Sequence, residues 1–373
     1  MGSDPIIGVV GGSGAVGGAV LRNVAGFGAL RVSGRDRSRV ALALAQEAEG
    51  SGEAYAVDPT DRQAVRRFCE GCDVVINCAG PSCRLLDSVA TAAIEAGAHY
   101  VDPGGDDPLH RILSLKEHRG TSVILSAGML PGLSGLLPAR LLGHFDAIER
   151  LTGYAGGLDR FSPAGAEDFL VSLSNGFGWG GMCIRQGEMR PSDGPAGDQI
   201  KLPLATFVAE AHPFVSTEFQ RVCRRLGVPN GDWYNVFAGR HVIDFLRHMQ
   251  GSGASRGSNA KPGVVNGLVD ASELDVAGRT PQQIIVIEAV GRKSDRSIVR
   301  TIAVRAGSGA ELTGSMAACA ALAVLGGRTP AGVHYAADIL SPEVALDQIK
   351  EWQPDFRYMV LEGGAIEIDE GVL

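Results

Sequence analysis

The sequence predicts an α/β protein that combines a doubly wound parallel-sheet domain with an inserted α+β domain whose sheet is mixed or antiparallel. The first domain is indicated by a glycine-rich turn behind an apolar strand, and by strand and helix patterns that alternate about five times. The second is indicated by strands of alternating polarity between Ile148 and about Val304. A chain of 373 residues is long enough for two domains that each bury a core.

The glycine-rich turn follows an apolar run that begins at Ile6, and a helix pattern covers Ala15–Val24 behind it. Gly12, Gly14 and Gly17 have G-x-G-x-x-G spacing, which permits a tight turn and close approach of the backbone to a pyrophosphate. The N–H groups at the start of such a helix can bind phosphate. The turn therefore predicts a dinucleotide site. Its expected cofactor-binding residues are Gly12, Ser13, Gly14, Ala15, Val16 and Gly17.

The second strand, Leu30–Ser33, ends where a dinucleotide fold reads the adenosine ribose. An acidic residue there would accept a hydrogen bond from a 2′-hydroxyl and repel a 2′-phosphate. Here Ser33 and Arg35 occupy the strand end, with Arg37 close behind, and a guanidinium binds phosphate bidentately. NADP(H) is therefore expected in preference to NAD(H). Asp36, which is acidic, argues against this preference. The alternative to phosphate binding is that the arginines are solvated side chains at the start of a helix.

The remaining elements of the first domain continue the alternation. The expected strands are Ala54–Val57, Asp73–Ala79, His99–Asp102 and Ser122–Ser126, and the expected helices are Arg39–Glu49, Arg62–Cys69, Leu85–Ala96 and Pro108–His118. The apolar run behind Asp73 is typical of a parallel strand buried on both faces. The strand ends that would pass the cofactor add four expected binding residues: Asp58, Ala79, Gly80 and Pro81.

Five segments occur in a fixed order: GGSGAVG, VSGRD, DVVINCAGP, AGAHYVDPGG and SAGMLPG. In this combination the chain resembles the saccharopine dehydrogenase-like oxidoreductases, from residue 5 to about 142 and more loosely over a closing helix at Met316–Leu325. The resemblance implies a Rossmann-type dinucleotide-binding domain (1–130), an inserted substrate and dimerisation domain (131–310) and a C-terminal segment (311–373) that returns to the first. It also implies NAD(P)-linked hydride transfer at a carbon–nitrogen bond.

Gly105 and Leu130 stand where the resemblance places a tyrosine and an acidic residue in saccharopine-forming reductases, so saccharopine is not the expected substrate. The expected function is NADPH-dependent reduction of an imine to an amine, in a small or carrier-protein-bound metabolite. One alternative is a reductase of a thiazoline or another cyclic imine in a specialised biosynthetic pathway. The other is a non-catalytic NADP-binding sensor or scaffold.

An imine is reduced best when its nitrogen is protonated or hydrogen-bonded, so a proton donor is expected near the nicotinamide. Asp102 and Asp106 follow a strand at the edge where doubly wound sheets bind ligands, and they are the expected catalytic residues. The alternative is that Asp102 only caps or braces its loop. Further possible donors in the second domain are Tyr154, Glu167, Asp168, His212 and His241, and possible carboxylate-binding residues are Arg185, Arg240 and Arg247.

In the inserted domain we expect strands at Ile148–Tyr154, Gln282–Val290 and Ile298–Arg305, and a helix that starts at Ser162-Pro163 with serine as its cap. The glycine-rich Asn175–Gly181 is expected either as a loop over a ligand or as an ordinary turn. Gly251–Gly263 has no apolar residue to anchor it, and we expect a mobile loop there, either a lid or, in preference, a disordered segment.

Composition excludes several function classes. A net charge of −8 disfavours a nucleic-acid partner, and no apolar run approaches the roughly 18 to 20 residues of a membrane span. No signal peptide precedes the first strand, so a cytoplasmic location is expected, and a homodimer is expected as the commonest assembly. No hydrolase or kinase motif occurs. The clustered cysteines, for which a metal or redox site is the alternative, are expected as small buried hydrophobes without a metal: Cys69, Cys72, Cys78 and Cys83.

Overall fold

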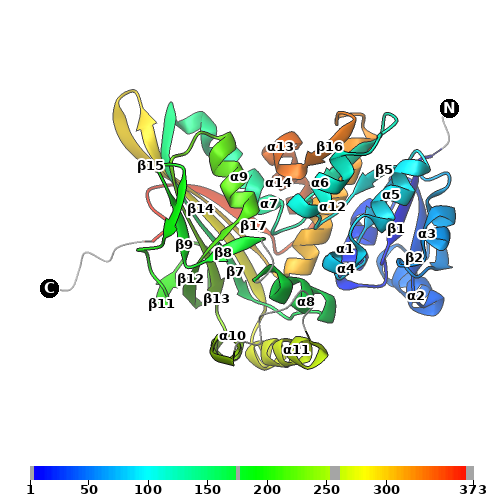
Figure 1. Cartoon of the computed structure of the whole chain (residues 1–373), viewed down its shortest axis with the longest axis horizontal. Coiled ribbons are helices and arrows are strands. Elements are labelled where there is room, and N and C mark those ends of the chain that lie inside the picture. Colours follow the sequence, from blue (N-terminus) through cyan, green and yellow to red (C-terminus); the bar gives the residue numbers. More distant parts are fainter. Residues whose placement is uncertain (1–3, 174–176, 253–260, 367–373) are drawn as a thin grey trace. The chain divides into compact units, whose positions relative to one another are not determined.

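The computed structural model describes residues 4–173, 177–252 and 261–366, which divide into two compact units (Figure 1). Unit 1 contains the described residues up to Leu136 together with Gly309–Trp352. Unit 2 contains Leu137–Ser308 and the residues from Gln353 onwards. The predicted fold class is confirmed, because unit 1 has a parallel sheet between helices and unit 2 has a mixed sheet. No helix in the described ranges is both long enough and apolar enough to cross a membrane.

The described part of unit 1 has a seven-stranded sheet in the order β16-β6-β5-β4-β1-β2-β3, and neighbouring strands are parallel. The strands are β1 (Ile6–Val10), β2 (Ala29–Gly34), β3 (Glu53–Ala56), β4 (Val74–Asn77), β5 (His99–Val101), β6 (Ser122–Leu125) and β16 (Gly332–Tyr335). The chain direction across the sheet reverses between β1 and β4. The loops after these two strands therefore flank the crevice where open α/β sheets bind ligands.

Helices cover both faces of this sheet. They are α1 (Ala15–Val24), α2 (Arg37–Glu47), α3 (Arg62–Cys69), α4 (Ser82–Leu85), α5 (Ser88–Glu95), α6 (Asp107–Ser114), α7 (Leu133–Leu136), α12 (Gly309–Leu325), α13 (Ala336–Ile339) and α14 (Pro342–Trp352). Neighbouring side chains of one strand enter different cores: Ile76 packs in the cluster that includes α1 and α12, and Val75 in the cluster that includes α3 and α5. Burial on both faces explains why β4 is apolar from Val74 to Ile76, before it ends at Asn77.

One predicted helix is divided. Instead of a helix over Leu85–Ala96, the chain forms α4 and then α5, with Leu86 between them at a φ of +44°. A leucine in the left-handed region cannot continue a right-handed helix. The sequence pattern did not reveal this break, because Leu86 is neither glycine nor proline.

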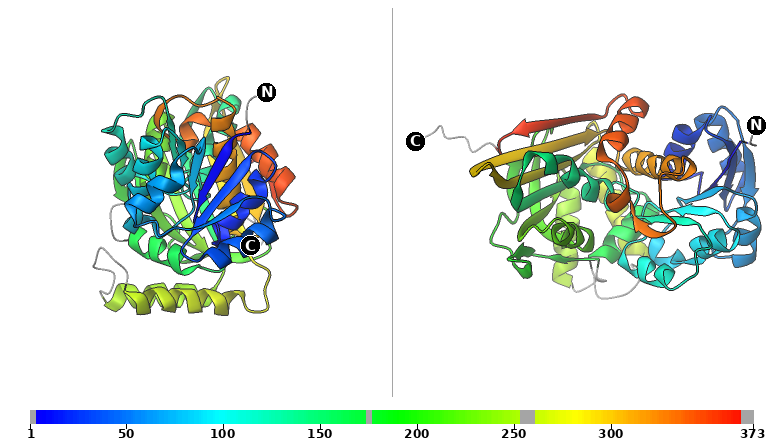
Figure 2. Two further views of the ribbon diagram at one scale, coloured as in Figure 1. Left: turned by 90° about the vertical axis from the view of Figure 1, so that its right-hand side faces the viewer. Right: turned by 90° about the horizontal axis from the view of Figure 1, so that it is seen from above.

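Helix α12, orange in Figure 2, packs directly against α1, although the two are far apart in the sequence. A Cβ atom on Gly314 would lie 2.5 Å from the Ala19 Cβ and 2.8 Å from the Val16 carbonyl oxygen. Beside this contact, the buried Asn23 amide donates to the Ser315 hydroxyl at 2.8 Å. The late part of the chain therefore positions the helix that follows the glycine-rich turn.

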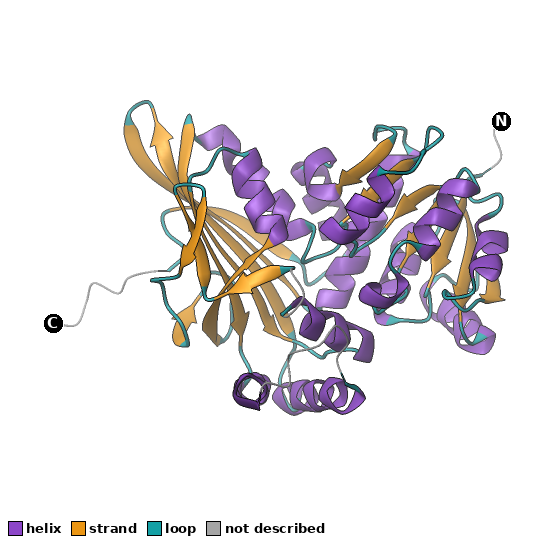
Figure 3. Cartoon of the chain, viewed as in Figure 1, coloured by secondary structure: helices purple, strands orange, loops and turns teal. Residues whose placement is uncertain are grey.

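The strands of unit 2, orange in Figure 3, form a mixed sheet. They are β7 (Ala147–Leu158), β8 (Gly178–Gly180), β9 (Met182–Arg185), β10 (Glu188–Pro191), β11 (Asp198–Lys201), β12 (Val208–Ser216), β13 (Asn230–Phe237), β14 (Gln282–Lys293), β15 (Arg296–Ala306) and β17 (Arg357–Glu362). Strand β7 is parallel to β13 and antiparallel to β14.

The helices of unit 2 include one that begins as the sequence predicted. They are the 3-10 helix η1 (Leu137–His144) and the α-helices α8 (Pro163–Ser172), α9 (Thr217–Arg225), α10 (Arg240–Ser252) and α11 (Pro262–Val276). Ser162 caps α8, because its hydroxyl accepts from the Gly165 N–H at 3.1 Å. Of the first expected loop, Asn175–Gly181, residues 178–180 form β8, and residues 175 and 176 lie outside the described residues. Of the second, Gly251–Gly263, the first residues end α10 at Ser252 and the last begin α11 at Pro262, and residues 253–260 lie outside the described residues.

The C-terminal segment differs from the sequence-based expectation. Residues 309–352 belong to unit 1, but β17 pairs antiparallel with β15 in the sheet of unit 2. The segment 311–373 therefore does not return to the first domain as a whole. Without β17, strand β15 would have an unpaired edge on the side away from β14. The extended residues 357–362 pair with this edge and complete its hydrogen bonding.

Substituting Gly314 with alanine tests the packing of α12 on α1. Gly314→Ala is expected to lower the free energy of unfolding by about 1–3 kcal/mol, because the methyl group overlaps Ala19, although alanine is the better helix former. Gly263→Ala is the matched control, since a Cβ atom on this helical glycine would meet no described atom within 4 Å. Urea unfolding measures both; equal stability of the two variants would contradict tight packing here.

Candidate functional site

The glycine-rich turn between β1 and α1 is held by its own backbone. The N–H groups of Gly11 and Gly12 both donate to the Ser33 carbonyl oxygen, at 2.8 and 3.0 Å. A Cβ atom on Gly12 would lie 2.1 Å from the Val32 Cγ1, and one on Gly17 would lie 2.3 Å from the Gly11 carbonyl oxygen. Packing inside the protein therefore requires these two glycines, whether or not a ligand binds.

Gly14 has a different environment. It is exposed, it is the N-cap residue of α1, and the nearest atom to a Cβ placed on it is the Gly11 carbonyl oxygen at 3.4 Å. The amides of Ala15, Val16 and Gly17 lie in the first helical turn, where an α-helix leaves N–H groups without intrahelical partners. These donors and the positive end of the helix dipole make the space beside Gly14 suitable for an anionic group such as a phosphate.

The loop after β4 lies directly against this turn. Gly11 has a φ of +82°, and a Cβ atom on it would lie 2.6 Å from the Ala79 backbone nitrogen. The Asn77 side chain accepts from that same Ala79 N–H at 3.3 Å. The structure thus brings Ala79, with Gly80 and Pro81 behind it, beside the glycine-rich turn. The sequence pattern did not single out Gly11 or Asn77, although both stand next to residues that it did.

Ser33, an expected cofactor-binding residue, lies near the end of β2. Its side chain is fully buried, and its hydroxyl has no hydrogen-bond partner among the described residues. What Ser33 contributes to the turn is its carbonyl oxygen, which ties down Gly11 and Gly12. The half-buried Ser13 lies close by, since its hydroxyl is 3.2 Å from the position of a Cβ on Gly34.

The charged residues after β2 have distinct surroundings. The Asp36 carboxylate caps α2, accepting from the N–H groups of Ser38 at 2.8 Å and Arg39 at 3.3 Å. Arg37 donates through Nε to the Ala54 carbonyl oxygen at 3.0 Å. Arg35 is exposed and forms no hydrogen bond or ion pair with a residue that the structure describes. Asp36, the acidic residue that argues against NADP(H), therefore binds the N–H groups at the start of α2, whereas Arg35 is available to bind a ligand.

Asp58 lies close enough to Arg35 to interact with it electrostatically. Its carboxylate accepts from the Thr60 N–H at 2.9 Å and the Thr60 hydroxyl at 2.7 Å. These hydrogen bonds, and then Arg35, hold the pKa of Asp58 below its usual value. Asp58 is consequently an ionised loop residue at the end of β3.

Asp102 is the centre of a buried hydrogen-bond group at the end of β5. The carboxylate, 4% exposed, accepts from the Tyr100 hydroxyl at 2.6 Å, the Asn77 amide at 3.2 Å and the Gly104 N–H at 2.9 Å. Burial and Asp102 raise the pKa of Tyr100 well above its usual value, which keeps this hydroxyl a donor. Asp102 thus joins the ends of β4 and β5 to the following loop, as a brace would.

Asp106 follows Gly105, whose φ is +67°, and is the N-cap residue of α6. It is 9% exposed, and its carbonyl oxygen accepts from the amides of Leu109 and His110. The next residue, Asp107, accepts from the Tyr335 hydroxyl at 2.6 Å. Asp102 and Asp106 therefore lie on one loop, at the carboxyl edge of the sheet.

The histidines considered in the second domain are engaged by carboxylates of unit 2. His241 Nδ1 lies 2.8 Å from an Asp275 oxygen, and Asp275 also accepts from backbone N–H groups at the start of α10. His212 lies 3.0 Å from Glu210, which also pairs with Arg247 at 2.6 Å. Burial lowers the pKa of His212, so this imidazole is neutral at pH 7.

The other residues considered in unit 2 are similarly placed on its elements. Arg240 pairs with Asp244 within α10 at 3.2 Å, and Arg185 pairs with Asp232 and Asp193. Glu167 is buried and Asp168 half-buried on α8.

The early cysteines lie in hydrophobic surroundings. Cys69 and Cys72 are buried in the cluster that includes α3 and α5, and desolvation raises the pKa of Cys69 to about 12. A thiol with such a pKa remains protonated at neutral pH and is a poor metal ligand. Within the described ranges, the group of side chains close enough to share a metal ion is Cys183, Asp193 and Asp232, all in unit 2.

Comparison with known proteins places this site in a family context. Residues 7–125 match the family model described as the saccharopine dehydrogenase NADP binding domain. The chain is also similar to apo histidine-tagged saccharopine dehydrogenase (L-Glu forming) from Saccharomyces cerevisiae, at 15% identity and a TM-score of 0.70, over 96% of this chain and 100% of that one. DAP dehydrogenase of C. glutamicum, in complex with DAP, is similar at 12% identity and a TM-score of 0.50, over 94% and 99% of the two chains.

At these identities the two solved structures show a shared fold, whereas the family model covers the glycine-rich turn, the Asp36 cap and the Asp102 brace. An NADP-binding domain implies an NAD(P) cofactor, and the open space at Gly14 fits one. The resemblance found in the sequence is thereby confirmed: residues 7–125 match the model of the saccharopine dehydrogenase NADP binding domain, and the chain shares its fold with saccharopine dehydrogenase.

Proposed function

We propose that the protein is an NADPH-dependent reductase that converts a carbon–nitrogen double bond to an amine in a small or carrier-protein-bound metabolite. The observation that carries the proposal is the open N-terminus of α1 beside Gly14, inside a domain that matches an NADP-binding family. The fold shared with saccharopine dehydrogenase and DAP dehydrogenase supports the reaction class.

Residues of unit 1 would divide the binding of the cofactor among them. The first-turn amides of Ala15 and Val16 would bind the pyrophosphate, and Gly14 would let it approach the backbone. Arg35 would bind the 2′-phosphate, with Arg37 beside it. The Asp36 carboxylate is directed to the N–H groups of α2, and the nearby ionised carboxylate is Asp58, which interacts with Arg35. When bound, the nicotinamide supplies the hydride, and the protein supplies binding, orientation and a proton.

The hydrogen bonds of Asp102 support a positioning role. The buried Asp102 carboxylate accepts from Tyr100, Asn77 and Gly104, so the protein's own donors already occupy it. It would hold the loop that carries Asp106, which is the proton-donor candidate of this loop.

A second candidate function is favoured by the residue at position 130. Leu130 is apolar and 41% exposed, where the family resemblance places an acidic residue. Together with the brace role of Asp102, this favours a non-catalytic NADP-binding sensor or scaffold as the alternative. The two functions differ in whether hydride is transferred.

Gly14→Ala separates ligand binding from folding. The variant is expected to keep its free energy of unfolding within about 1 kcal/mol, because the added methyl group has room, yet to bind NADPH at least tenfold more weakly. Gly17→Ala is the contrasting variant and is expected to lose about 2 kcal/mol or more, since its methyl group would overlap the Gly11 backbone. Urea unfolding and NADPH fluorescence titration measure both effects. Full NADPH affinity in Gly14→Ala would place the pyrophosphate elsewhere.

Arg35→Ala tests the choice of cofactor. NADPH affinity is expected to fall about tenfold or more, while NADH affinity stays unchanged, because the guanidinium would contact only the 2′-phosphate. Arg66→Ala removes another exposed arginine, on α3, and serves as the control. If NADH binds the wild type as tightly as NADPH does, and Arg35→Ala alters neither affinity, the preference for NADPH is wrong.

A panel of linear and cyclic imines, supplied with NADPH and followed by absorbance at the nicotinamide band, tests catalysis. Turnover of any member supports the reductase; tight NADPH binding without turnover favours the sensor.

Asp102→Asn tests the brace. The variant is expected to lose about 1–3 kcal/mol of stability, since an amide replaces an acceptor that faces three donors. Lost turnover at unchanged stability and NADPH affinity would instead show a direct chemical role for Asp102.

A further inference from the structure

Unit 2 contains a polar cavity of about 290 Å³ over strands β7, β9 and β13. Alternate residues of β7, namely Arg150, Thr152 and Tyr154, line it, because side chains two apart on a strand point to the same face. Asp232 of β13 lies level with Thr152 in the parallel register. The cavity is thus built on paired strands, and nothing in the proposed function of unit 1 accounts for it.

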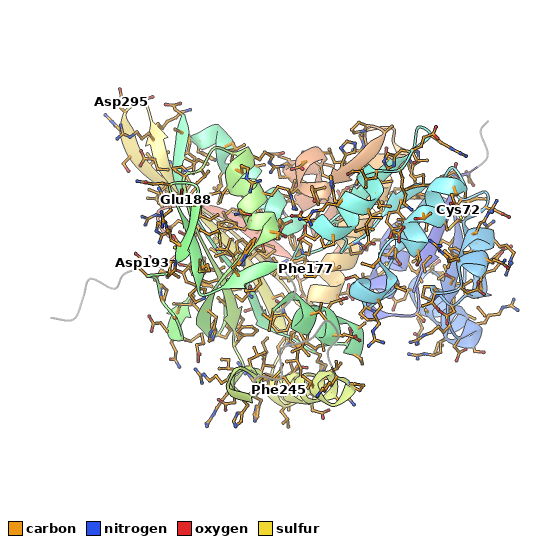
Figure 4. The ribbon with its side chains drawn as sticks, viewed as in Figure 1. Cys72, Phe177, Glu188, Asp193, Phe245 and Asp295 are labelled. Carbon is orange, nitrogen blue, oxygen red and sulfur yellow. The ribbon has the colours of Figure 1, made fainter. Side chains whose placement is uncertain are left out.

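The cavity contains one arginine that the protein itself satisfies. Arg185 grips both oxygens of Asp232, at 3.1 and 2.9 Å, and also donates to Asp193 at 2.7 Å. Asp193, labelled in Figure 4, lies in the turn after β10. Because its guanidinium already donates to two carboxylates, Arg185 lines the cavity but has few N–H groups left to bind a ligand.

The same two aspartates lie near Cys183, and the three side chains offer oxygen and sulfur atoms within 4.8 Å of one another. A metal ion there would have to displace the Arg185 guanidinium, which already pairs with both carboxylates. The Cys183 sulfur is also engaged, since it donates to the Pro191 carbonyl oxygen at 3.5 Å. The group is therefore an ion-pair network, and the ligand chemistry of the cavity is set by its other residues.

Those other residues are hydrogen-bond donors without partners. Arg150 is exposed and forms no hydrogen bond or ion pair with a residue that the structure describes. Thr152 and Tyr154 are 9% and 5% exposed, and their hydroxyls likewise have no partner in the described part of the chain. Neither hydroxyl oxygen is among the buried atoms without a partner, so both oxygens are open to the cavity, where each can donate to a ligand or to water.

Stacking on a neighbouring ring fixes the position of the Tyr154 side chain. Its ring stacks on Tyr234, with centroids 5.1 Å apart and planes 15° from parallel. Burial raises the pKa of Tyr154, so its hydroxyl stays protonated and can donate. The Arg150 guanidinium and the hydroxyls of Thr152 and Tyr154 therefore line the same cavity. The two aspartates of this cavity already pair with Arg185.

We propose that this cavity is a binding site for a small molecule bearing an oxyanion, either a carboxylate or a phosphate, which Arg150 binds bidentately and the hydroxyls of Thr152 and Tyr154 complete. The two arginines and two aspartates of the cavity balance in charge. Arg150 forms no ion pair with a residue that the structure describes, although it interacts electrostatically with Asp193. The cavity is open to solvent, and its volume of about 290 Å³ has room for the oxyanion itself.

Sodium acetate and inorganic phosphate are the probes, each titrated into the full chain at constant ionic strength by calorimetry and by thermal shift. At least one probe is expected to bind in the millimolar range, and Arg150→Gln to weaken it about tenfold. Tyr154→Phe, which removes only the hydroxyl, is expected to weaken it severalfold. Arg190→Gln is the matched control: this exposed arginine of β10 pairs with Glu188 outside the cavity, so binding should not change.

The outcome also distinguishes the two sources of the oxyanion, since preference for acetate or for phosphate identifies the group. A general salt effect would act equally on wild type and Arg150→Gln, so only a difference between them supports the site. Absence of binding by either probe, or equal binding in wild type, Arg150→Gln and Tyr154→Phe, would overturn the proposal. Failure of the NADPH experiments would leave this result unaffected, because the cavity lies entirely within unit 2.

Discussion

The interaction on which the candidate cofactor site depends is the close contact of backbone with backbone at the point where the sheet of unit 1 reverses its order. Gly11 lies against the loop after β4, Gly12 against β2, and Gly17 against the Gly11 carbonyl oxygen. A side chain at any of these positions would push the elements apart. Because the contacts fix where α1 begins, they also fix where its first-turn N–H groups are presented.

The carboxylates nearest this turn are used by the protein itself. Asp36 caps α2, Asp58 is held by Thr60, and Asp102 binds Tyr100, Asn77 and Gly104. These hydrogen bonds direct the three carboxylates toward the protein's own donors and leave them charged. In the proposed site, their part is to hold the loops around the turn.

Each proposed site contains one arginine that the protein's own acceptors bind and one that they do not. In unit 1, Arg37 donates to a backbone carbonyl whereas Arg35 forms no such bond within the described ranges. In unit 2, Arg185 of β9 pairs with two aspartates, whereas Arg150 of β7, on the other side of β13, lines the cavity and forms no ion pair within the described residues. Since a satisfied guanidinium adds little to ligand binding, the unpaired members are where anionic ligands are expected.

The sequence by itself determined what depends on near neighbours in the chain: the glycine spacing, the alternation of strand and helix, and the serine cap of α8. Such features follow from backbone geometry within a few residues. Only the tertiary structure decided that Asp102 would meet Asn77, that Arg185 would meet Asp232, that α12 would pack on α1, and that β17 would join β15. These partners are distant in sequence, and strand pairing or helix packing, which no local pattern encodes, brings them together.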